Sequence, residues 1–198
     1  MDMVIKEIKK DALAEGIPIM LDDGIEFLCN FIKEHDCKKI LEIGAAVGYS
    51  AIMMADVDEK INITTIERDE KRYLKALENI KKADKEKQIK LIYNDALNIS
   101  LEDEEFDLIF IDAAKAQNIK FFQRFGLYLK SHGFIITDNL NFHGLVDKDL
   151  EEIESKNVRG IVRKIREFKE FLLENNDYET VFYDVGDGIS VSEKIKEW

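Results

Sequence analysis

Short apolar runs alternate with longer amphipathic stretches from residue 39 onward. The runs are KKILEI, INITTIE, IKLIYN, FDLIFID, GFIITDN, YETVFYDV and GISVSE. This alternation is typical of a doubly wound α/β sheet, in which helices cross between parallel strands. Residues 40–43 and 108–111 are almost wholly apolar, which indicates central strands that are covered by helices on both faces.

The stretches between these runs carry apolar residues at helical spacing. Residues 69–83 place Tyr73, Leu77 and Ile80 on one face of an expected crossover helix, and Asp69 is a suitable N-cap for it. Ahead of the first strand, the segment 1–35 also has a helical pattern. Its apolar face is formed by Leu21, Ile25, Leu28 and Ile32.

The end of the pattern differs from the rest. Only Gly186, Asp187 and Gly188 separate the last two runs, which predicts an antiparallel hairpin instead of another helical crossover. The chain has no internal repeat and no linker rich in Pro, Gly or Ser. We therefore expect a single domain over residues 1–198.

Composition and charge narrow the class of protein. The 198 residues are 45% hydrophobic and 35% charged, and 29 basic against 41 acidic residues give a net charge of −12. Wholesale disorder is excluded. The net charge argues against a protein that coats nucleic acid or anionic membrane with its whole surface, although a local basic patch is still allowed. Cys29 and Cys37 are too few for a disulfide framework. With no signal-peptide core and no apolar run near the roughly 18 residues of a membrane span, a cytoplasmic protein is expected.

The first strand leads into a glycine turn, LEIGAAVGYSAI. Gly44 and Gly48 flank the turn, Glu42 precedes it, and a helix starts near Tyr49 and Ser50. Glycines let the backbone approach a ligand closely, and a helix start offers free N–H groups. The G-x-x-x-G spacing is not the GxGxxG of dinucleotide binding, so NAD is disfavoured.

Two further strand ends carry polar residues. Glu67 ends the second strand and could accept both hydroxyl protons of an adenosine ribose. Asn94, Asp95 and Ala96 follow the third strand and could bracket the adenine. A turn with an acid but no phosphate cradle fits S-adenosylmethionine. The alternative is that the glycines only allow tight packing and Glu67 is a surface acid.

Strands four and five also end in polar side chains. Asp112 ends the fourth strand three residues before Lys115, and Asp138 and Asn139 end the fifth. These ends face the ligand crevice of an open α/β sheet. Two carboxylates and an amide oxygen suit a divalent cation such as Mg²⁺, whereas the alternative is that Asp138 and Asn139 only form a turn. Asp107 starts its strand and belongs to the opposite rim.

A basic stripe lies on the helix expected over residues 156–172. Lys156, Arg159, Arg163 and Arg166 fall within one arc, and the apolar residues fall on the other side. Solvation of an exposed face is the alternative explanation. Of the three histidines, only His143, four residues after Asn139, is placed to touch a substrate.

The motifs LEIGAAVGYSA, TIERDE, FIDAAK and TDN, in this order, resemble those of the metal-dependent class I O-methyltransferases, typified by the catechol and caffeoyl-CoA enzymes. The chain is similar in particular to the bacterial tRNA 5-hydroxyuridine methyltransferases. That narrower resemblance extends to FIDAAKAQNIKFF, TDNLNFHGLV, NVRGIVRKIREFKEFL and YETVFYDVGDGISVS. The chain departs from the family pattern at Asn94, where glycine is usual, and from the tRNA branch at His143, where Arg or Lys is usual.

The resemblance implies a Rossmann-like class I methyltransferase with a seven-stranded, mostly parallel sheet, an antiparallel C-terminal hairpin and helices on both faces. It implies S-adenosylmethionine and a divalent metal as cofactors, a homodimer, and residues 1–35 covering the cofactor site. Metal ligands carry over to Asp112, Asp138 and Asn139, and the catalytic lysine to Lys115. Cofactor contacts carry over to Met20, Gly44, Tyr49, Ser50, Glu67, Asp95 and Ala96. We expect Glu42, Gly48 and Asp112 at the cofactor as well, and Asp112 beside Lys115 in catalysis.

These expectations lead to one preferred activity. We expect methylation of 5-hydroxyuridine to 5-methoxyuridine at the tRNA wobble position, with Arg159, Arg163 and Arg166 contacting the RNA. A catechol-like or caffeoyl-CoA-like phenol is the alternative acceptor. A cofactor-binding regulator with a dead site is the least favoured reading, because Asp112 and Lys115 are both present.

Overall fold

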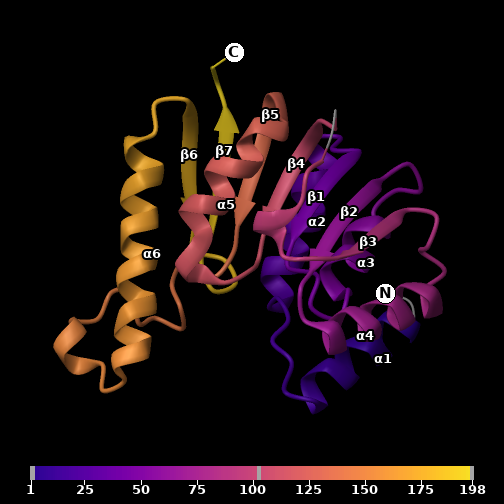
Figure 1. Ribbon diagram of the computed structural model, residues 1–198, viewed down its shortest axis with the longest axis horizontal. Coiled ribbons are helices and arrows are strands. Elements are labelled where there is room, and N and C mark those ends of the chain that lie inside the picture. Colours follow the sequence, from indigo (N-terminus) through magenta and orange to yellow (C-terminus); the bar gives the residue numbers. More distant parts are fainter. Residues whose placement is uncertain (1–2, 102–103, 197–198) are drawn as a thin grey trace.

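The computed structural model describes residues 3–101 and 104–196. Their strands form one seven-stranded sheet in the order β3-β2-β1-β4-β5-β7-β6 (Figure 1). The strands are β1 (Lys39–Ile43), β2 (Asn62–Glu67), β3 (Ile89–Tyr93), β4 (Phe106–Ile111), β5 (Leu129–Thr137), β6 (Tyr178–Tyr183) and β7 (Ile189–Lys194). The first five strands are parallel, and β7 pairs antiparallel with both β5 and β6. The predicted fold class and the C-terminal hairpin are confirmed.

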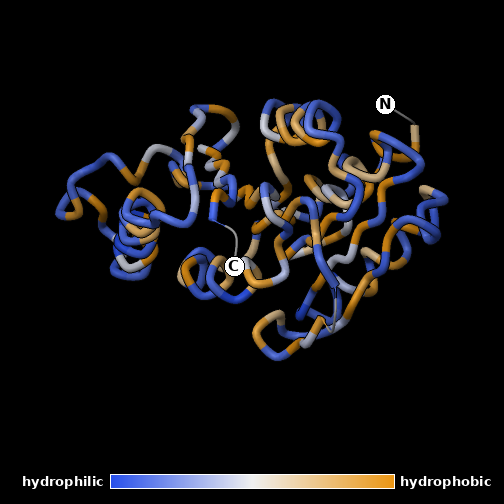
Figure 2. Tube along the Cα trace, turned by 90° about the horizontal axis from the view of Figure 1, so that it is seen from above, coloured by the Kyte–Doolittle hydropathy of each residue, from blue (hydrophilic) through white to orange (hydrophobic). Residues whose placement is uncertain are grey.

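Helices lie on both sides of the sheet, as the view from above shows (Figure 2). They are α1 (Met3–Ala14), α2 (Asp22–Glu34), α3 (Tyr49–Ala55), α4 (Glu70–Lys82), α5 (Asn118–Phe125) and α6 (Lys156–Glu174). Apolar residues of α1 to α4 share one buried cluster with one face of the sheet, and those of α5 and α6 share another with the opposite face. The strand β4 between them is central, and Leu108 and Phe110 are fully buried.

The expected helix over 69–83 forms as α4, and the Asp69 carboxylate accepts a hydrogen bond from the Arg72 main-chain N–H at 3.0 Å. Its buried face differs from the prediction, because Ala76, Asn79 and Ile80 are buried whereas Leu77 is 47% exposed. The reason is close approach to the glycine turn, since Asn79 donates to the Val47 carbonyl at 2.9 Å. A contact of this kind needs small or polar residues, which apolar spacing does not reveal.

Two other expectations need correction. Leu21 is 52% exposed because it precedes α2 instead of lying on its buried face, which consists of Ile25, Leu28 and Ile32 with their neighbours. The hairpin turn is longer than predicted and spans 184–188, since β6 ends at Tyr183 and β7 begins at Ile189.

Asp107 links the amino-terminal ends of the parallel strands. Its carboxylate accepts hydrogen bonds from the main-chain N–H groups of Lys38 at 2.8 Å and Lys39 at 2.7 Å, and it pairs with Lys130 at 2.6 Å. Asp107 thus joins the starts of β1, β4 and β5, on the rim opposite the carboxyl ends of the strands. Among the described residues, no helix is long and apolar enough to cross a bilayer.

Candidate active site

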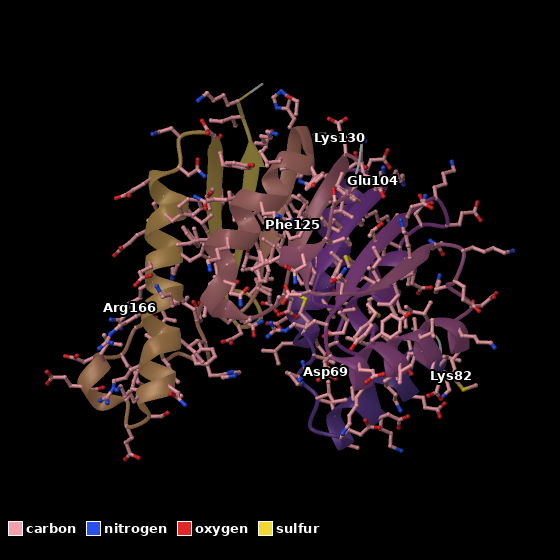
Figure 3. All side chains as sticks on the ribbon, viewed as in Figure 1. Asp69, Lys82, Glu104, Phe125, Lys130 and Arg166 are labelled. Atoms are coloured by element: carbon pink, nitrogen blue, oxygen red, sulfur yellow. The ribbon has the colours of Figure 1, made fainter. Side chains whose placement is uncertain are left out.

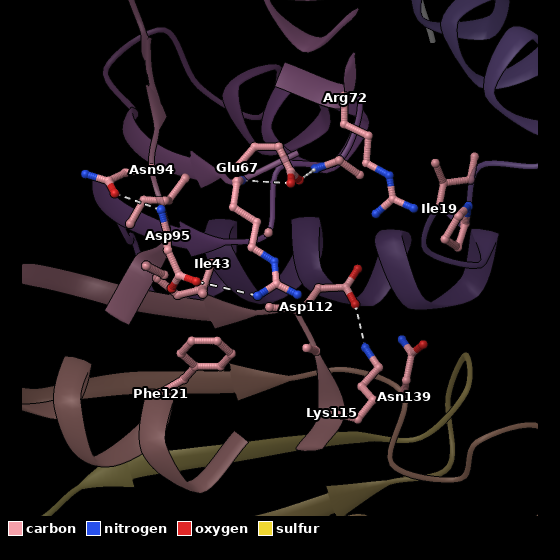
Figure 4. Close-up of a pocket in the computed structure, with 18 residues that line it drawn as sticks. Ile19, Ile43, Glu67, Arg72, Asn94, Asp95, Asp112, Lys115, Phe121 and Asn139 are labelled. Carbon is pink, nitrogen blue, oxygen red and sulfur yellow. Dashed lines mark hydrogen bonds and ion pairs between the residues drawn. The ribbon is translucent and has the colours of Figure 1, made fainter. Parts of the chain in front are cut away.

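A cavity of about 330 Å³ opens where the parallel strands end (Figure 4). Its lining contains residues expected from the sequence at five strand ends, namely Gly44, Glu67, Asn94, Asp95, Ala96, Asp112, Lys115 and Asn139. The glycine turn, Glu67, Asp112 and Asn139 therefore face one space, whereas Asp138 is buried and does not line it. This convergence is the central feature of the site.

The two glycines of the turn have different roles. Gly44 has φ +102°, and a Cβ on it would lie 2.5 Å from the Asp112 carbonyl oxygen, so only glycine lets β1 and β4 approach this closely. Gly48 has φ +80° and faces Ala76 of α4, and it is not part of the cavity lining. For Gly48 the structure favours the packing explanation over the predicted cofactor contact.

Glu67 is held rigidly at the end of β2. Its Oε2 accepts from the Ala46 N–H, and its Oε1 accepts from the N–H groups of Arg68 and Asp69, each at 2.8 Å. Three backbone donors fix the carboxylate and stabilise its charge. A carboxylate can accept about four hydrogen bonds, so capacity remains for a ligand hydroxyl.

Glu42 lies behind the cavity and does not line it. The side chain is fully buried, and its oxygens accept hydrogen bonds from the Ser50 and Thr65 hydroxyls. Burial raises the pKa of Glu42 to about 7, although the two hydroxyls oppose this shift. The sequence predicts that Glu42 contacts the cofactor. In the structure Glu42 does not line the cavity, and it accepts a hydrogen bond from the Ser50 hydroxyl.

Met20, Tyr49 and Ser50 border a smaller hollow beside the main cavity, next to Gly44 and Asp112. All three are nearly buried, and Met20 lies in the segment that joins α1 to α2. The N-terminal segment therefore reaches the ligand edge of the sheet at this point. The expectation that it covers a cofactor stays a prediction.

The third strand end forms one wall of the cavity. Asp95 accepts from the Leu97 N–H at 2.9 Å, and the Asn94 side chain accepts from the Asp95 N–H at 2.8 Å. Arg68 and Arg72 also line the cavity, and Arg68 lies 3.5 Å from the Asp95 carboxylate. The two arginines were not predicted, because the sequence signals only that Arg68 adjoins Glu67.

Residues that follow β4 and β5 form the opposite wall, namely Asp112, Lys115 and Asn139. The ammonium of Lys115 pairs with Asp112 at 2.8 Å, and Asn139 lies beside this pair (Figure 4). Asp138 is 2% exposed and accepts from the Asn139 N–H at 2.7 Å. Burial, and next the negative charge of Asp112, raise the pKa of Asp138 to about 7.

This donor set fits a divalent cation. Two carboxylates that repel each other and an amide oxygen are hard ligands of the kind Mg²⁺ takes. Within residues 3–101 and 104–196, no group of three or more His, Cys, Asp or Glu is arranged to hold a metal. The Asn139 amide, as the third ligand beside Asp112 and Asp138, stays a prediction from the sequence.

The remaining predicted residues lie outside the cavity lining. The His143 side chain is 77% exposed on the loop after Asn139. Arg166 donates from Nε to the Val146 carbonyl at 2.9 Å and from Nη2 to the Lys148 carbonyl, so it ties this loop to α6 (Figure 3). Arg163 is exposed and Arg159 is half-buried. One member of the predicted RNA-binding stripe thus has a role within the fold.

Sequence reasoning also missed Asp187 as a possible functional residue. This acid lies in the turn between β6 and β7 and is 8% exposed. Its carboxylate accepts a hydrogen bond from the His143 N–H at 2.6 Å. The sequence showed Asp187 only as the middle residue of a glycine-rich turn, and an acid there is ordinary.

Comparison with known proteins agrees with this geometry. The family model described as O-methyltransferase matches residues 1–195. A caffeoyl-CoA O-methyltransferase of Populus kitakamiensis is 29% identical over 194 residues, which cover 94% of this chain and 82% of that protein. A crystal structure of a candidate caffeoyl-CoA O-methyltransferase from Staphylococcus aureus superposes with a TM-score of 0.93 at 36% identity, covering 98% of this chain and 93% of the other. An SAH-bound methyltransferase of Podospora anserina gives 0.85 at 26% identity, covering 100% and 89%.

Proposed function

The chain belongs to the O-methyltransferase family and is an S-adenosylmethionine-dependent O-methyltransferase, and from this premise we propose that its acceptor is a small phenol. The reacting hydroxyl would have a second oxygen beside it, as in a catechol or a caffeoyl group. The observation that carries this proposal is the cluster of Asp112, Lys115 and Asn139 on the cavity wall opposite Asp95, with Asp138 buried behind it. The caffeoyl-CoA enzyme among the relatives supports the same acceptor class.

In this proposal the cofactor lies along the cavity from β3 to β1. Glu67 accepts the ribose hydroxyls, because its carboxylate is already fixed by backbone donors. Asp95 and Ala96 bracket the adenine, and the hollow at Tyr49 and Ser50 receives the amino-acid end. The sulfonium then lies near Asp112, where the carboxylate favours its positive charge.

Asp112, Asp138 and Asn139 would hold a divalent cation, Mg²⁺ by its preference for such oxygens, and when bound it would make the acceptor hydroxyl more acidic. The three residues also fix where the acceptor lies relative to the methyl group. Holding two reactants in line lowers the barrier by as much as about 7–11 kcal/mol in favourable cases.

Lys115 is the proposed proton acceptor. It pairs with Asp112 at 2.8 Å in the described arrangement, so it must leave this pair and lose a proton before it can act as a base. The acceptor O–H then breaks toward Lys115 Nζ, the oxygen forms a bond to the methyl carbon, and the carbon–sulfur bond breaks. The positive sulfonium becomes a neutral thioether, which balances the charge.

A tRNA acceptor is the second candidate. The observation that favours it is the basic surface of α6, where Lys156 and Arg163 are exposed. The tether from Arg166 to the Val146 and Lys148 carbonyls weakens it, and so does the net charge of −12. The homodimer and the cytoplasmic location expected from the sequence also stay predictions.

The test compares acceptors under one set of conditions. Purified protein with S-adenosylmethionine and Mg²⁺ is given catechol, caffeoyl-CoA or tRNA that contains 5-hydroxyuridine. We expect phenol methylation that EDTA abolishes, loss of turnover in Asp138→Ala, and unchanged turnover in the exposed control Asp147→Ala. If the protein methylates tRNA efficiently and leaves both phenols unmethylated, the acceptor is tRNA and the phenol proposal is wrong. Full activity in EDTA would show that the reaction needs no divalent metal.

A further inference from the structure

The loop over residues 139–144 has an unusual backbone. Four of its residues have positive φ, namely Asn139 at +67°, Phe142 at +46°, His143 at +56° and Gly144 at +76°. Three of these are not glycine, and the left-handed region is unfavourable for residues with a side chain. Such a conformation persists only where the surroundings hold it.

The turn between β6 and β7 supplies the contacts that hold this loop. The Leu140 N–H donates to the Gly188 carbonyl at 2.9 Å, and the Asn141 N–H donates to the Asp187 carbonyl at 2.7 Å. A Cβ on Gly188 would lie 2.6 Å from the Asn141 side chain, so the turn packs directly on the loop. The turn is fixed from its other side as well, because the Gly186 N–H donates to Asp23 of α2 at 3.1 Å.

Asp187 adds a side-chain contact to this support. Its Oδ1 accepts from the His143 N–H at 2.6 Å, and its Oδ2 lies 3.6 Å from the Nδ1 atom of the same residue. Oδ2 is buried and has no hydrogen-bond partner among the residues that the structure describes. Burying a carboxylate is unfavourable unless its bonds compensate, and the bond from the His143 N–H provides such compensation.

We propose that Asp187 is a positioning residue, which locks residue 143 in the left-handed conformation and thereby holds Asn139 at the cavity wall. Asn139 lies four residues before His143, and it both opens the strained loop and lines the cavity. The inference rests on the proposed function in one respect, since the wall that Asn139 belongs to is the acceptor side. The cofactor contacts on β2 and β3 lie on the opposite wall, so Asp187 acts on the acceptor and not on cofactor affinity.

The test uses Asp187→Ala, Asp187→Asn and a matched control, Asp184→Asn. Asp184 is an exposed acid of the same turn, and it accepts a hydrogen bond from the Asn141 side chain at 3.2 Å. Asparagine at 187 keeps an oxygen for the His143 N–H, whereas alanine removes it. Two measurements are made on each full-length protein: amide hydrogen exchange of a peptide covering residues 139–146, and steady-state methylation of catechol with Mg²⁺ alongside calorimetric titration with S-adenosylmethionine.

Loss of a hydrogen bond to a charged group corresponds to about a tenfold to hundredfold effect. We therefore expect Asp187→Ala to speed exchange in the loop by about tenfold or more, and to lower kcat/KM for the phenol by a similar factor. The dissociation constant of S-adenosylmethionine should stay within about twofold of the wild-type value. A general loss of stability would affect both quantities, so it would not lower kcat/KM while leaving cofactor binding unchanged. Asp187→Asn should restore protection of the loop, and Asp184→Asn should match the wild type.

Unchanged exchange and unchanged kinetics in Asp187→Ala would overturn the inference. So would an equal weakening of cofactor binding. If the alanine variant does not fold, the asparagine variant provides the test. It retains an oxygen that accepts from the His143 N–H, so a loss of protection of the loop in this variant would contradict a positioning role. A wild-type protein that methylates no phenol would refute the proposed function, while the exchange measurement would still test the role of Asp187.

Discussion

The buried carboxyl group of Glu42 makes the stability of the fold depend on pH in a predictable direction. The side chain is fully buried between the Ser50 and Thr65 hydroxyls, and burial raises the pKa from its ordinary 4.5 to about 7. A rise of this size corresponds to about 3 kcal/mol between the two protonation states. Glu42→Gln keeps the shape of the side chain and removes its titration.

The sign follows from proton binding. Below pH 4.5 the carboxyl is protonated in both the folded and the unfolded chain. Between pH 4.5 and 7 the unfolded chain has lost the proton and the folded chain retains it, so the free energy of unfolding falls as pH rises. Relative to wild type, Glu42→Gln should therefore gain about 3 kcal/mol of stability between pH 4.5 and pH 8.

The assay is urea unfolding of both proteins at half-unit steps from pH 4.5 to 8. Other acids that titrate in this range, Asp138 among them, contribute equally to both proteins and cancel in the difference. Glu154→Gln, which changes an exposed glutamate, serves as the surface control and should follow the wild type. Parallel curves for wild type and Glu42→Gln would refute the argument.

Three further predictions concern the cavity and the loop that Arg166 ties to α6. Glu67→Ala leaves three backbone N–H groups without their acceptor, so calorimetry should show S-adenosylmethionine binding weakened by about tenfold or more; unchanged affinity would place the ribose elsewhere. Gly44→Ala puts a Cβ 2.5 Å from the Asp112 carbonyl and should lower Tm by several degrees, on the order of the loss expected for strain at a special φ, whereas an unaltered Tm would contradict the close approach. Arg166→Gln removes the hydrogen bonds to the Val146 and Lys148 carbonyls and should speed proteolysis of that loop with methylation of catechol retained; a loop that stays equally resistant would show that the tether is not needed.

Much of the fold could be predicted because burial leaves a direct mark on the sequence. Strands covered on both faces are mostly apolar, and the runs that form β1 and β4 are so apart from Lys39, Glu42 and Asp107. The buried face of α4 could not be predicted from spacing. This face includes a hydrogen bond from Asn79 to the Val47 carbonyl, 32 residues earlier in the chain, and apolar periodicity carries no information about such a bond.

In the candidate site, too, some residues could be predicted from the sequence and others could not. Residues at strand ends, such as Glu67 and Asp112, could be placed because the topology of a parallel sheet brings those ends together. Asp187 could not, since its importance depends on a turn and a loop that meet only in the folded protein. The hydrogen bonds of Arg166 could not be predicted either. Helical spacing shows on which side of the helix a residue lies, but it does not show that a neighbouring loop places carbonyl groups next to that residue.

The order of the strands has a consequence for how the protein is made on the ribosome. The seventh strand in sequence lies between β5 and β6 in the sheet, so β5 keeps an unpaired edge until residues 189–194 have emerged. During that interval the nascent chain exposes the main chain of a strand that contains Ile135 and Ile136, and an open apolar edge invites pairing with other chains. Aggregation through this edge is therefore expected during synthesis, and it would be prevented by a chaperone that shields β5 until β7 pairs with it.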